Sequence, residues 1–501
     1  MARWNVKTKG TAAKPTAVNK AGGAAYKIDE VDELIGLVWT SFCADRFYAK
    51  WSATLPHLKA LIEKYPQIAA YAALVARKHF GLRSISHVVA AYVAHFSSGE
   101  EWLRPFLYAV VHRPDDITEI LAVRSQLGLP KAVPHSMRRA FASRLEEYNE
   151  YQLAKYRGDD KAFCMKDAIF LCHPKHTVAT TALVGGTLKN SETWEAMGNT
   201  EATWLTLLRE GKLGYLALLR NLRNMLAYNN AELNDLVAKG LVNAEAINRA
   251  MIMPHQFVRA EEALSESGGY IPKRIMDALV EATELSVDNL PKWDGTTVIG
   301  LDGSGSMRPG MFGNVKGKDA WTTARTFAAA LVKRCDNPVL IAFTTQAWHL
   351  SMGTMPTLLG QARLNEKVPI GGTNMAAVFD LCSAQRIKAD RVILLTDEQS
   401  WIGGTGFQAF QKWRGVMGIN PVVHSVDLES YGTCQFPKSS KVNLVFGWNS
   451  ALFNVLKELE RKEIGSLSEY CMRAGELVMT NAMAYREKRL ASQLGEEEID
   501  V

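Results

Sequence analysis

The 501-residue sequence contains no unbroken apolar run of about 18 residues, the length that a membrane-spanning helix needs, so we expect no membrane contact. Residues 1–25 are basic and rich in Ala, Gly and Thr, without the apolar segment of a secretory signal, and we expect a flexible tail there. The seven cysteines are scattered and never spaced as CxxC, which argues against a disulfide framework or a cysteine-bound zinc ion. This cysteine usage favours a reducing, cytoplasmic setting.

The bulk composition is that of an ordinary globular protein, with 47% hydrophobic and 22% charged residues. A chain of this length favours two or three domains over one. The formal net charge of +6 is a modest basic excess, which is compatible with a nucleic-acid partner without identifying one. The places where basic residues cluster therefore carry more information than their number.

Residues 26–290 show helical periodicity, with no strand-like alternation of apolar and polar residues. Segments with apolar residues at helical spacing lie at 58–80, 84–96, 101–112, 116–127, 203–209, 213–227, 230–239 and 271–282. Glycine and proline separate these segments, and Pro272 suits the first turn of the last one. Many short helices without a long central bundle predict a helical-repeat solenoid.

After residue 290 the pattern changes to short apolar segments that alternate with helices. Strands are expected at 296–301, 339–343, 347–350, 391–395, 421–426 and 442–446, and helices at 320–334, 374–387 and 451–463. This alternation predicts a mostly parallel, doubly wound α/β domain over residues 291–465. A C-terminal helix and an acidic tail are expected over residues 466–501.

Three polar clusters fall at strand ends of the α/β half, where such sheets bind ligands. Two carboxylates and three hydroxyls in these clusters make an all-oxygen donor set, which suits a hard cation, Mg²⁺ before Mn²⁺ or Ca²⁺. The candidate metal ligands are Asp302, Ser304, Ser306, Thr373 and Asp397. Because hydroxyl ligands are neutral, a bound cation would keep enough positive charge to take an acidic group from a partner.

A catalytic interpretation of the same clusters fits less well. Neither Ser304 nor Ser306 lies in the G-x-S-x-G pattern of a nucleophile elbow. The segment nearest to a phosphate loop, residues 313–319, is one residue short and ends in Asp. Glu398 is the only general base that we can place near the two carboxylates, so we predict binding rather than enzymatic activity. Taken singly, each cluster is also explained by a plain loop or a helix cap.

Residues 131–176 combine many cations with aromatic residues, as in proteins that neutralise phosphates and stack unpaired bases. The candidate RNA-binding residues here are Lys131, His135, Arg138, Arg139, Lys155, Arg157, Lys166, His173 and Lys175. Carboxylates in the same segment leave a solvated face of mixed charge as the alternative. Arg220 and Arg223 are further candidates, because a spacing of three puts them on one face of a helix; pairing with carboxylates of a neighbouring repeat is the alternative there.

The D-x-S-x-S … T … D order of the metal candidates resembles the metal-ion-dependent adhesion site of von Willebrand factor A domains. The helical half is similar to the Ro autoantigen family, known for its TROVE module. Residues 214–225 (GYLALLRNLRNM) resemble that family's ALLRNL segment, and residues 253–257 (MPHQF) resemble its HPFH segment. The resemblance implies a ring of HEAT-like helical repeats followed by an α/β A domain that holds Mg²⁺.

The resemblance also implies a function. Ro proteins bind small structured Y RNAs on their outer surface and single-stranded 3′ ends of misfolded RNAs in a central hole, in RNA quality control or processing. Lys155, Arg157, Lys166 and His173 fall on the family's RNA-contacting stretch, although a histidine that ends a helix before Pro174 explains His173 equally. The alternative is a metal-dependent adaptor that binds a protein partner, such as an exoribonuclease, with the helical half as a scaffold. Neither hypothesis involves DNA.

Overall fold

The structure, a computed structural model, describes residues 13–41, 43, 50–188, 197–266, 268–308, 320–350, 357–438, 441–449, 451–461 and 464–497. Outside this part lie residues 1–12 of the expected tail, residues 498–501 of the expected acidic tail, and the whole segment compared above with a phosphate loop, residues 313–319. Within the described part, a helix-rich half precedes a six-stranded sheet, and a long helix follows it. This order confirms the predicted fold class.

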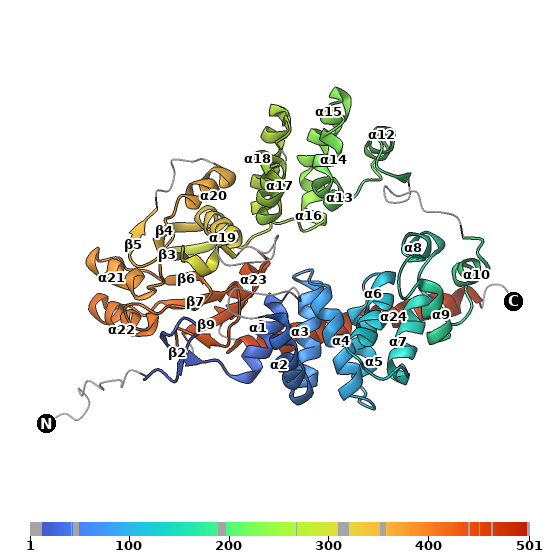
Figure 1. Ribbon diagram of the computed structural model, residues 1–501, viewed down its shortest axis with the longest axis horizontal. Helices are drawn as coiled ribbons and strands as arrows, with labels where there is room; N and C mark the ends of the chain where they lie inside the picture. Colours follow the sequence, from blue (N-terminus) through green and yellow to red (C-terminus); the bar gives the residue numbers. More distant parts are fainter. Residues whose placement is uncertain are drawn as a thin grey trace.

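The first helical arm, α1 to α10, forms the lower part of the molecule in Figure 1. Its helices are α1 (Glu30–Thr40), α2 (Trp51–Lys64), α3 (Pro66–Lys78), α4 (Ser84–Phe96), α5 (Leu103–Val110), α6 (Pro114–Gln126), α7 (His135–Leu145), α8 (Glu150–Lys155), α9 (Met165–Cys172) and α10 (Val178–Gly185). The prediction of one helical segment over 58–80 is wrong, because α2 and α3 meet at Pro66. Proline disfavours helical backbone in the residue before it and suits a first turn, so Pro66 begins a new helix.

The second helical arm, at the top of Figure 1, builds a hydrophobic core separate from the one that the first arm shares with the sheet. Its helices are α12 (Glu201–Arg209), α13 (Tyr215–Arg220), α14 (Leu222–Leu226), α15 (Ala231–Leu241), α16 (Ala244–Arg249), α17 (Pro254–Glu266) and α18 (Lys273–Val287). The segment predicted as one helix over 213–227 is divided at Asn221 (φ −101°, ψ 11°). The Asn221 amide donates 2.9 Å to Ala217 O, which shows how asparagine competes for helix backbone groups.

The α/β domain contains one sheet in the order β5-β4-β3-β6-β7-β9, in which only β5 runs antiparallel to its neighbour. Its strands are β3 (Trp293–Asp302), β4 (Cys335–Phe343), β5 (Ala347–His349), β6 (Arg391–Thr396), β7 (Val422–Asp427) and β9 (Val442–Phe446). Its helices are α19 (Ala320–Arg334), α20 (Leu358–Glu366), α21 (Ala376–Ala384), α22 (Gly406–Met417) and α23 (Leu452–Leu459). Phe327 of α19 contacts Phe453 of α23, and Phe379 of α21 contacts Phe410 of α22, so paired helices cover the sheet on either side (Figure 1).

Glu460, just after α23, links that helix to the N-terminal parts of β6 and β7. Its carboxylate accepts hydrogen bonds from Arg391 Nη2 of β6 at 2.7 Å and His424 Nε2 of β7 at 2.9 Å. Burial alone would raise the pKa of Glu460, but the hydrogen bonds from His424 and Arg391 outweigh it and lower the pKa to about 2. The contact therefore needs an ionised carboxylate.

Part of the expected N-terminal tail is folded. β1 (Ala17–Val18) and β2 (Ala24–Lys27) form a hairpin, and β2 pairs with β8 (Thr433–Cys434) in a second, three-stranded sheet. The prediction of a flexible tail over residues 1–25 is therefore wrong for the hairpin. The physical reason is burial: Tyr26 is only 3% exposed, and its ring centroid lies 6.0 Å from that of Phe407.

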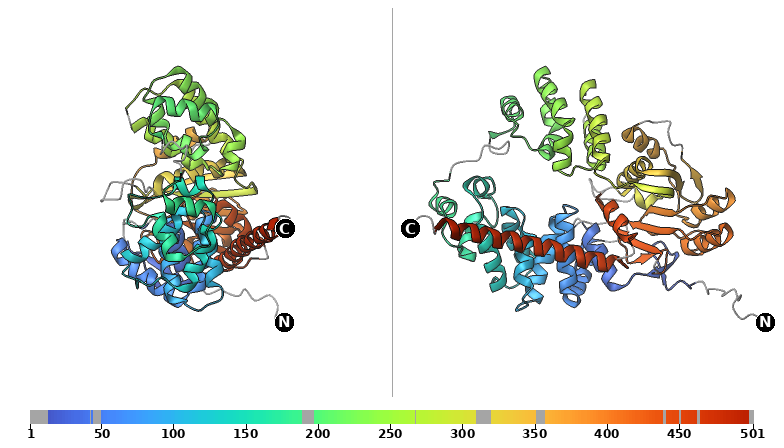
Figure 2. Two further views of the ribbon diagram at one scale, coloured as in Figure 1. Left: turned by 90° about the vertical axis from the view of Figure 1, so that its right-hand side faces the viewer. Right: turned by 180° about the vertical axis from the view of Figure 1, so that it is seen from behind.

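The long C-terminal helix α24 (Leu467–Glu497) crosses the first arm, as the view from behind in Figure 2 shows. It packs chiefly against α3 and α5, and Arg489 near its end donates 3.2 Å to Glu146 O after α7. Gly475 permits the close approach, because a Cβ atom there would lie 2.5 Å from the Tyr71 Cβ on α3. None of the described helices is both long and apolar enough to span a bilayer.

The helical half begins and ends on the α/β domain. At its start, α1 packs against β9, and at its end α17 and α18 pack against α19 and α20. The chain therefore makes a circuit from the α/β domain through both arms and back to it (Figure 1). The two arms come to lie on the same side of the domain, where their loops line shared cavities.

Candidate metal centre and nucleic-acid interface

Three loops at the carboxyl ends of the central strands carry the predicted metal ligands. We call residues 302–307 the first metal loop, residues 371–375 the second and residues 397–402 the third. Asp302 is the last residue of β3, and Asp397 directly follows β6, the parallel neighbour of β3. Both aspartates are fully buried at one edge of the sheet, the position where open α/β sheets bind ligands.

The first metal loop is tied to the second. Ser304 forms a parallel bridge with Gly371, and its Oγ lies 3.3 Å from the Oγ of Ser306. Gly303 allows this close packing, because a Cβ atom there would lie 2.5 Å from Val368 Cγ1. Gly303 therefore lets the first metal loop pack closely on the chain before the second one, whereas a Cβ atom at Gly305 would make only an ordinary 3.8 Å contact with Ile370.

The second metal loop is tied to the third through Thr373. Its carbonyl oxygen accepts hydrogen bonds from Ser400 Oγ at 3.2 Å and from Trp401 N at 3.1 Å. Thr373 is buried, like the four other predicted ligands. The structure thus brings all five predicted ligands into one cluster of mutually bonded loops.

The two aspartates of the cluster have different hydrogen-bond partners. Asp302 Oδ2 accepts 2.7 Å from Thr396 Oγ1, and Asp397 Oδ1 accepts 3.1 Å from Gln399 N. Asp397 Oδ2 is buried without a hydrogen-bond partner of normal geometry among the described residues, although Ser306 lies near enough to lower the pKa of that carboxyl. Burial raises the pKa of both carboxyls, and for Asp397 the charge of Asp302 raises the pKa further.

This donor set fits a divalent cation. Burial and mutual repulsion make two neighbouring carboxylates costly, and a bound cation would remove that cost and occupy the unpartnered oxygen. In the described part of the chain, no group of three or more His, Cys, Asp or Glu side chains is placed to share a metal ion. A metal ion here would therefore depend on the hydroxyl ligands, which favour Mg²⁺ over softer metals.

A cavity of about 730 Å³ lies between the two arms and the α/β domain. We call it the basic cavity, because its described lining includes four cationic side chains and no Asp or Glu. The cations are Lys78 at the end of α3, Arg220 of α13, Arg223 of α14 and Arg259 of α17. In the described residues neither Arg220 nor Arg223 forms an ion pair, so the alternative of pairing with carboxylates between repeats is not realised there.

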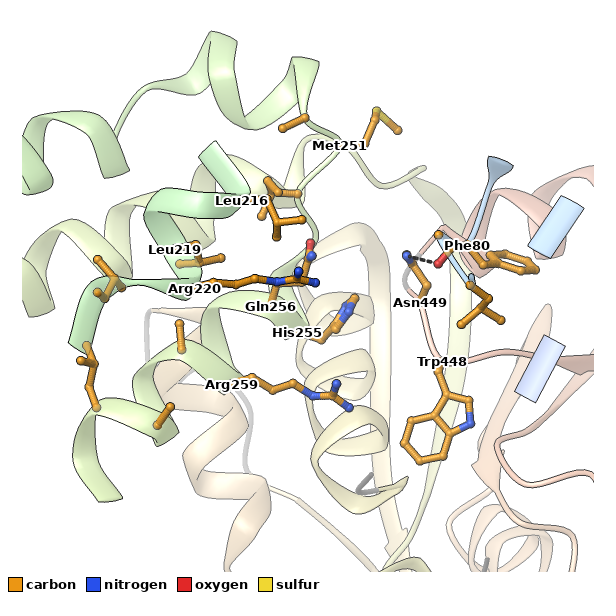
Figure 3. Close-up of a pocket in the computed structure, with 18 of the residues that line it drawn as sticks. Phe80, Leu216, Leu219, Arg220, Met251, His255, Gln256, Arg259, Trp448 and Asn449 are labelled. Carbon is orange, nitrogen blue, oxygen red and sulfur yellow. Dashed lines mark hydrogen bonds between the residues drawn. The ribbon is translucent and has the colours of Figure 1, made fainter. Parts of the chain in front are cut away.

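Figure 3 shows how the walls of the basic cavity face each other. Arg220 and His255 point from the second arm toward Asn449, which follows β9, and Arg259 points toward the neighbouring Trp448. On that opposite wall the Asn449 amide donates 3.3 Å to Phe80 O and so joins the α/β domain to the first arm (Figure 3). Burial, with the charge of Arg259, lowers the pKa of His255 to about 3, so this ring is neutral at neutral pH.

A second cavity of about 790 Å³ adjoins the basic cavity, and Lys78, His79, Met251 and Asn449 line both. Residues of α24 line part of its wall, among them Tyr485, which is 61% exposed. We call it the adjoining cavity. The cations in its described lining are Lys78 and Arg144, and Arg144 forms a 2.7 Å ion pair with Glu147, which also lines it. An exposed aromatic ring can stack an unpaired base.

The other predicted RNA-binding residues lie elsewhere on the first arm. His135, Arg138 and Arg139 lie on α7, Lys155 ends α8, Lys166 lies on α9, and Lys131, Arg157, His173 and Lys175 lie in the connecting segments. None of these nine lines either cavity. His173 is exposed at the end of α9 with left-handed backbone (φ 51°), so it does cap a helix, and Arg157 forms a 3.0 Å ion pair with Asp159.

Lys78 and Arg259 are cavity residues that the sequence analysis missed. A signal for Arg259 existed, because it lies four residues after His255 and hence on the same helix face, two residues beyond the segment quoted for its family resemblance. Lys78 carries no such signal. It reaches the cavity only because α3 ends there, which depends on how the two arms fold back onto the α/β domain.

The comparisons with known proteins agree with this architecture. A model of the TROVE domain matches residues 44–186 and 185–276, and a model of the Ro60 vWA domain matches residues 296–459. The RNA-binding protein RO60 of Deinococcus radiodurans is 24% identical over 265 residues, an alignment that covers 50% of this chain and 50% of that protein. Telomerase protein component 1 of Mus musculus is 22% identical over 299 residues, which span 41% of this chain and 11% of that protein.

Among solved structures, the crystal structure of the Deinococcus radiodurans RO (RSR) protein has a TM-score of 0.59 at 20% identity and covers 86% of this chain and 100% of that one. At this identity the likeness establishes the fold. The two domain models add the family, since they match consecutive parts of the chain in the order seen in the structure. The chain belongs to the Ro family, with a TROVE domain followed by a Ro60 vWA domain.

Proposed function

We propose that this chain is a non-catalytic RNA-binding protein that takes single-stranded RNA 3′ ends into the basic cavity. The observation that carries the proposal is the composition of that cavity, whose described lining has four cations and no carboxylate. Arginine side chains pair with phosphates, and the adjoining cavity offers an exposed tyrosine ring to a base. The printed name of the Deinococcus relative, an RNA-binding protein, supports the same class of ligand.

A small structured RNA of the Y type is the second proposed ligand, on the outer surface of the first arm. The predicted cations on α7 to α9 and in the adjacent segments lie outside both cavities, and Lys131, Arg139 and Lys175 among them are exposed. Duplex RNA is recognised mainly through its backbone, for which such a surface is suited. With both ligands the protein would act in the quality control or processing of small RNAs in the cytoplasm.

The test of the cavity is RNA affinity in two arginine variants. The double variant Arg220→Gln and Arg223→Gln should weaken binding of a fluorescent single-stranded oligonucleotide about tenfold, and it should lower the slope of log affinity against log salt by about 0.7 for each lost contact. Arg209→Gln is the matched control, since Arg209 is an exposed arginine of the second arm that pairs with Glu232. If the double variant and the control bind the oligonucleotide equally at low salt, the cavity does not hold RNA.

We also propose that Mg²⁺ binds Asp302, Ser304, Ser306, Thr373 and Asp397 and that the ion captures an acidic group of a protein partner, such as an exoribonuclease. The buried Asp397 Oδ2 supports this, because among the described residues it has no hydrogen-bond partner of normal geometry. A bound ion would supply positive charge for the partner's carboxylate, while the three loops fix the position of that charge. Asp302→Asn should abolish Mn²⁺ binding, measured by calorimetry, and leave RNA affinity unchanged. Loss of RNA binding together with metal binding would favour one combined site.

A further inference from the structure

The N-terminal hairpin has a turn built around one buried asparagine. Asn19 is 5% exposed, and its Oδ1 accepts hydrogen bonds from Gly23 N at 2.8 Å and Ala21 N at 3.1 Å. The Asn19 backbone N also donates 2.9 Å to Gly23 O. The side-chain oxygen of Asn19 therefore stabilises the turn, and its Nδ2 group can donate a hydrogen bond to another part of the molecule.

The Nδ2 group of Asn19 contacts the third metal loop. Asn19 Nδ2 donates 2.6 Å to Ser400 O, and Lys20 N donates 2.7 Å to the side-chain oxygen of Gln399. Gly23 lies so close to the loop that a Cβ atom there would collide with Ser400 O. The hairpin turn thus packs backbone to backbone on the residues that follow Asp397.

The Ser400 carbonyl oxygen also accepts a hydrogen bond from Gln435. Gln435, which follows β8 and is fully buried, donates its side-chain amide 3.3 Å to Ser400 O and 3.4 Å to Ala24 O of the hairpin. The hydroxyl of Ser400 in turn donates to Thr373 O in the second metal loop. One network therefore runs from the hairpin through Ser400 to two of the three metal loops.

We propose that the N-terminal hairpin is a positioning element of the metal site, with Asn19 as its key residue. The proposal rests on the proposed metal site. Asp397 is two residues from Gln399 and three from Ser400. If these two residues lost their hydrogen bonds to the hairpin, the third metal loop could shift and move the Asp397 carboxylate away from the other metal ligands. Hydrogen bonds that fix a ligand-bearing loop raise metal affinity. Because coupling is reciprocal, a bound ion should also stabilise the hairpin.

The substitution Asn19→Asp separates the two roles of the side chain. It keeps an oxygen for the turn amides and removes the donor to Ser400, so the hairpin can form while its hold on the loop is lost. We expect Mn²⁺ affinity, measured by calorimetry on the full chain, to fall about tenfold, in line with the loss of one buried hydrogen bond and the approach of a carboxylate to a carbonyl. Lys14→Ala is the matched control, since Lys14 is an exposed residue just before the hairpin.

Hydrogen exchange of the wild type gives a second measurement that needs no hairpin variant. Mg²⁺ should slow exchange of the amides in residues 17–27 in the wild type and have no effect on them in Asp302→Asn. A wild type that binds neither Mn²⁺ nor Mg²⁺ would overturn the proposed metal site. A wild type that binds Mn²⁺, with Asn19→Asp equal to the Lys14 control or with hairpin exchange unchanged by Mg²⁺, would overturn the role of the hairpin alone.

Discussion

Asp116, in the first turn of α6, is the centre of a buried ionic network in the first arm. It is 0% exposed and accepts hydrogen bonds from Arg77 Nη2 and Arg83 Nη2, each at 2.8 Å, and from His87 Nε2 at 3.0 Å. Two backbone amides between α5 and α6 also donate to it at 3.0 Å. Although burial opposes the charge, the hydrogen bond from His87 and the charge of Arg77 hold the pKa of Asp116 far below its usual range.

The substitution Asp116→Ala should cost about 3–5 kcal/mol of stability, the usual penalty for removing one partner of a buried ion pair. Arg77 is the reason, because it is only 8% exposed and would keep its charge without the carboxylate. The control is Glu119→Gln on the same helix. Its pair with Lys161 lies at the surface, with side chains 38% and 48% exposed, and such a pair contributes only about 0–1 kcal/mol.

Native-state hydrogen exchange is the suitable assay, because it reports local stability in a chain with more than one core. The amides of α3, α4 and α6 should lose protection in Asp116→Ala, and those of α17 and α18 should keep it. A carboxyl with a lowered pKa stabilises the fold above its unfolded pKa of about 3.9, and this stabilisation is lost as the pH falls below that value. A difference from Glu119→Gln of less than about 1 kcal/mol would refute the reasoning.

Three further outcomes are expected. Gly475→Ala should loosen α24 from α3 and speed its proteolysis, whereas Gly415→Ala, where a Cβ atom meets nothing within 4 Å, should raise helix stability by about 0.5–1 kcal/mol. Glu460→Gln should lower the melting temperature near neutral pH and should flatten the loss of stability on acidification from about pH 4.5 to about pH 2, where the wild-type carboxylate is protonated. Iodoacetamide should modify the partly exposed Cys164 before Cys172, whose pKa burial raises to about 12, and equal rates in mass spectra would contradict this.

Four of the five metal candidates could be grouped from the sequence because they end or follow β3 or β6, whereas Thr373 precedes α21 and reaches the site through the bridge from Gly371 to Ser304. An apolar run such as residues 392–395 marks a buried parallel strand, and the carboxyl ends of parallel strands lie at one edge of their sheet. Asp302 and Asp397 must then be neighbours whenever β3 and β6 are adjacent. The hairpin behind this site could not be predicted, because a strand of two residues carries no periodicity and Asn19 acquires its partners from residues far along the chain.

The cavity residues were harder to predict from the sequence than the metal candidates. Arg220 and Arg223 were identified as one helix face, yet the structure places them on two short helices divided at Asn221, and both still line the basic cavity. The cations of α7 to α9 formed the more obvious cluster in the sequence, but they lie outside both cavities. A concave site made by separate arms depends on tertiary contacts, so local composition identifies exposed basic surfaces more readily than the lining of a cavity.

The metal loops and the cavities are separate sites, connected through the sheet and its contacts with the two arms. In the described residues no metal loop lines either cavity, so an ion can affect RNA binding only through the sheet and its junctions with the arms. Asn449 is the clearest junction, since it follows β9, lines both cavities and bonds Phe80 of the first arm. Two ligands influence each other only through an element whose state both change. We therefore expect RNA affinity to be the same with and without Mg²⁺, and an Mg²⁺ effect that is present in the wild type and absent from Asp302→Asn would contradict this independence of the two sites.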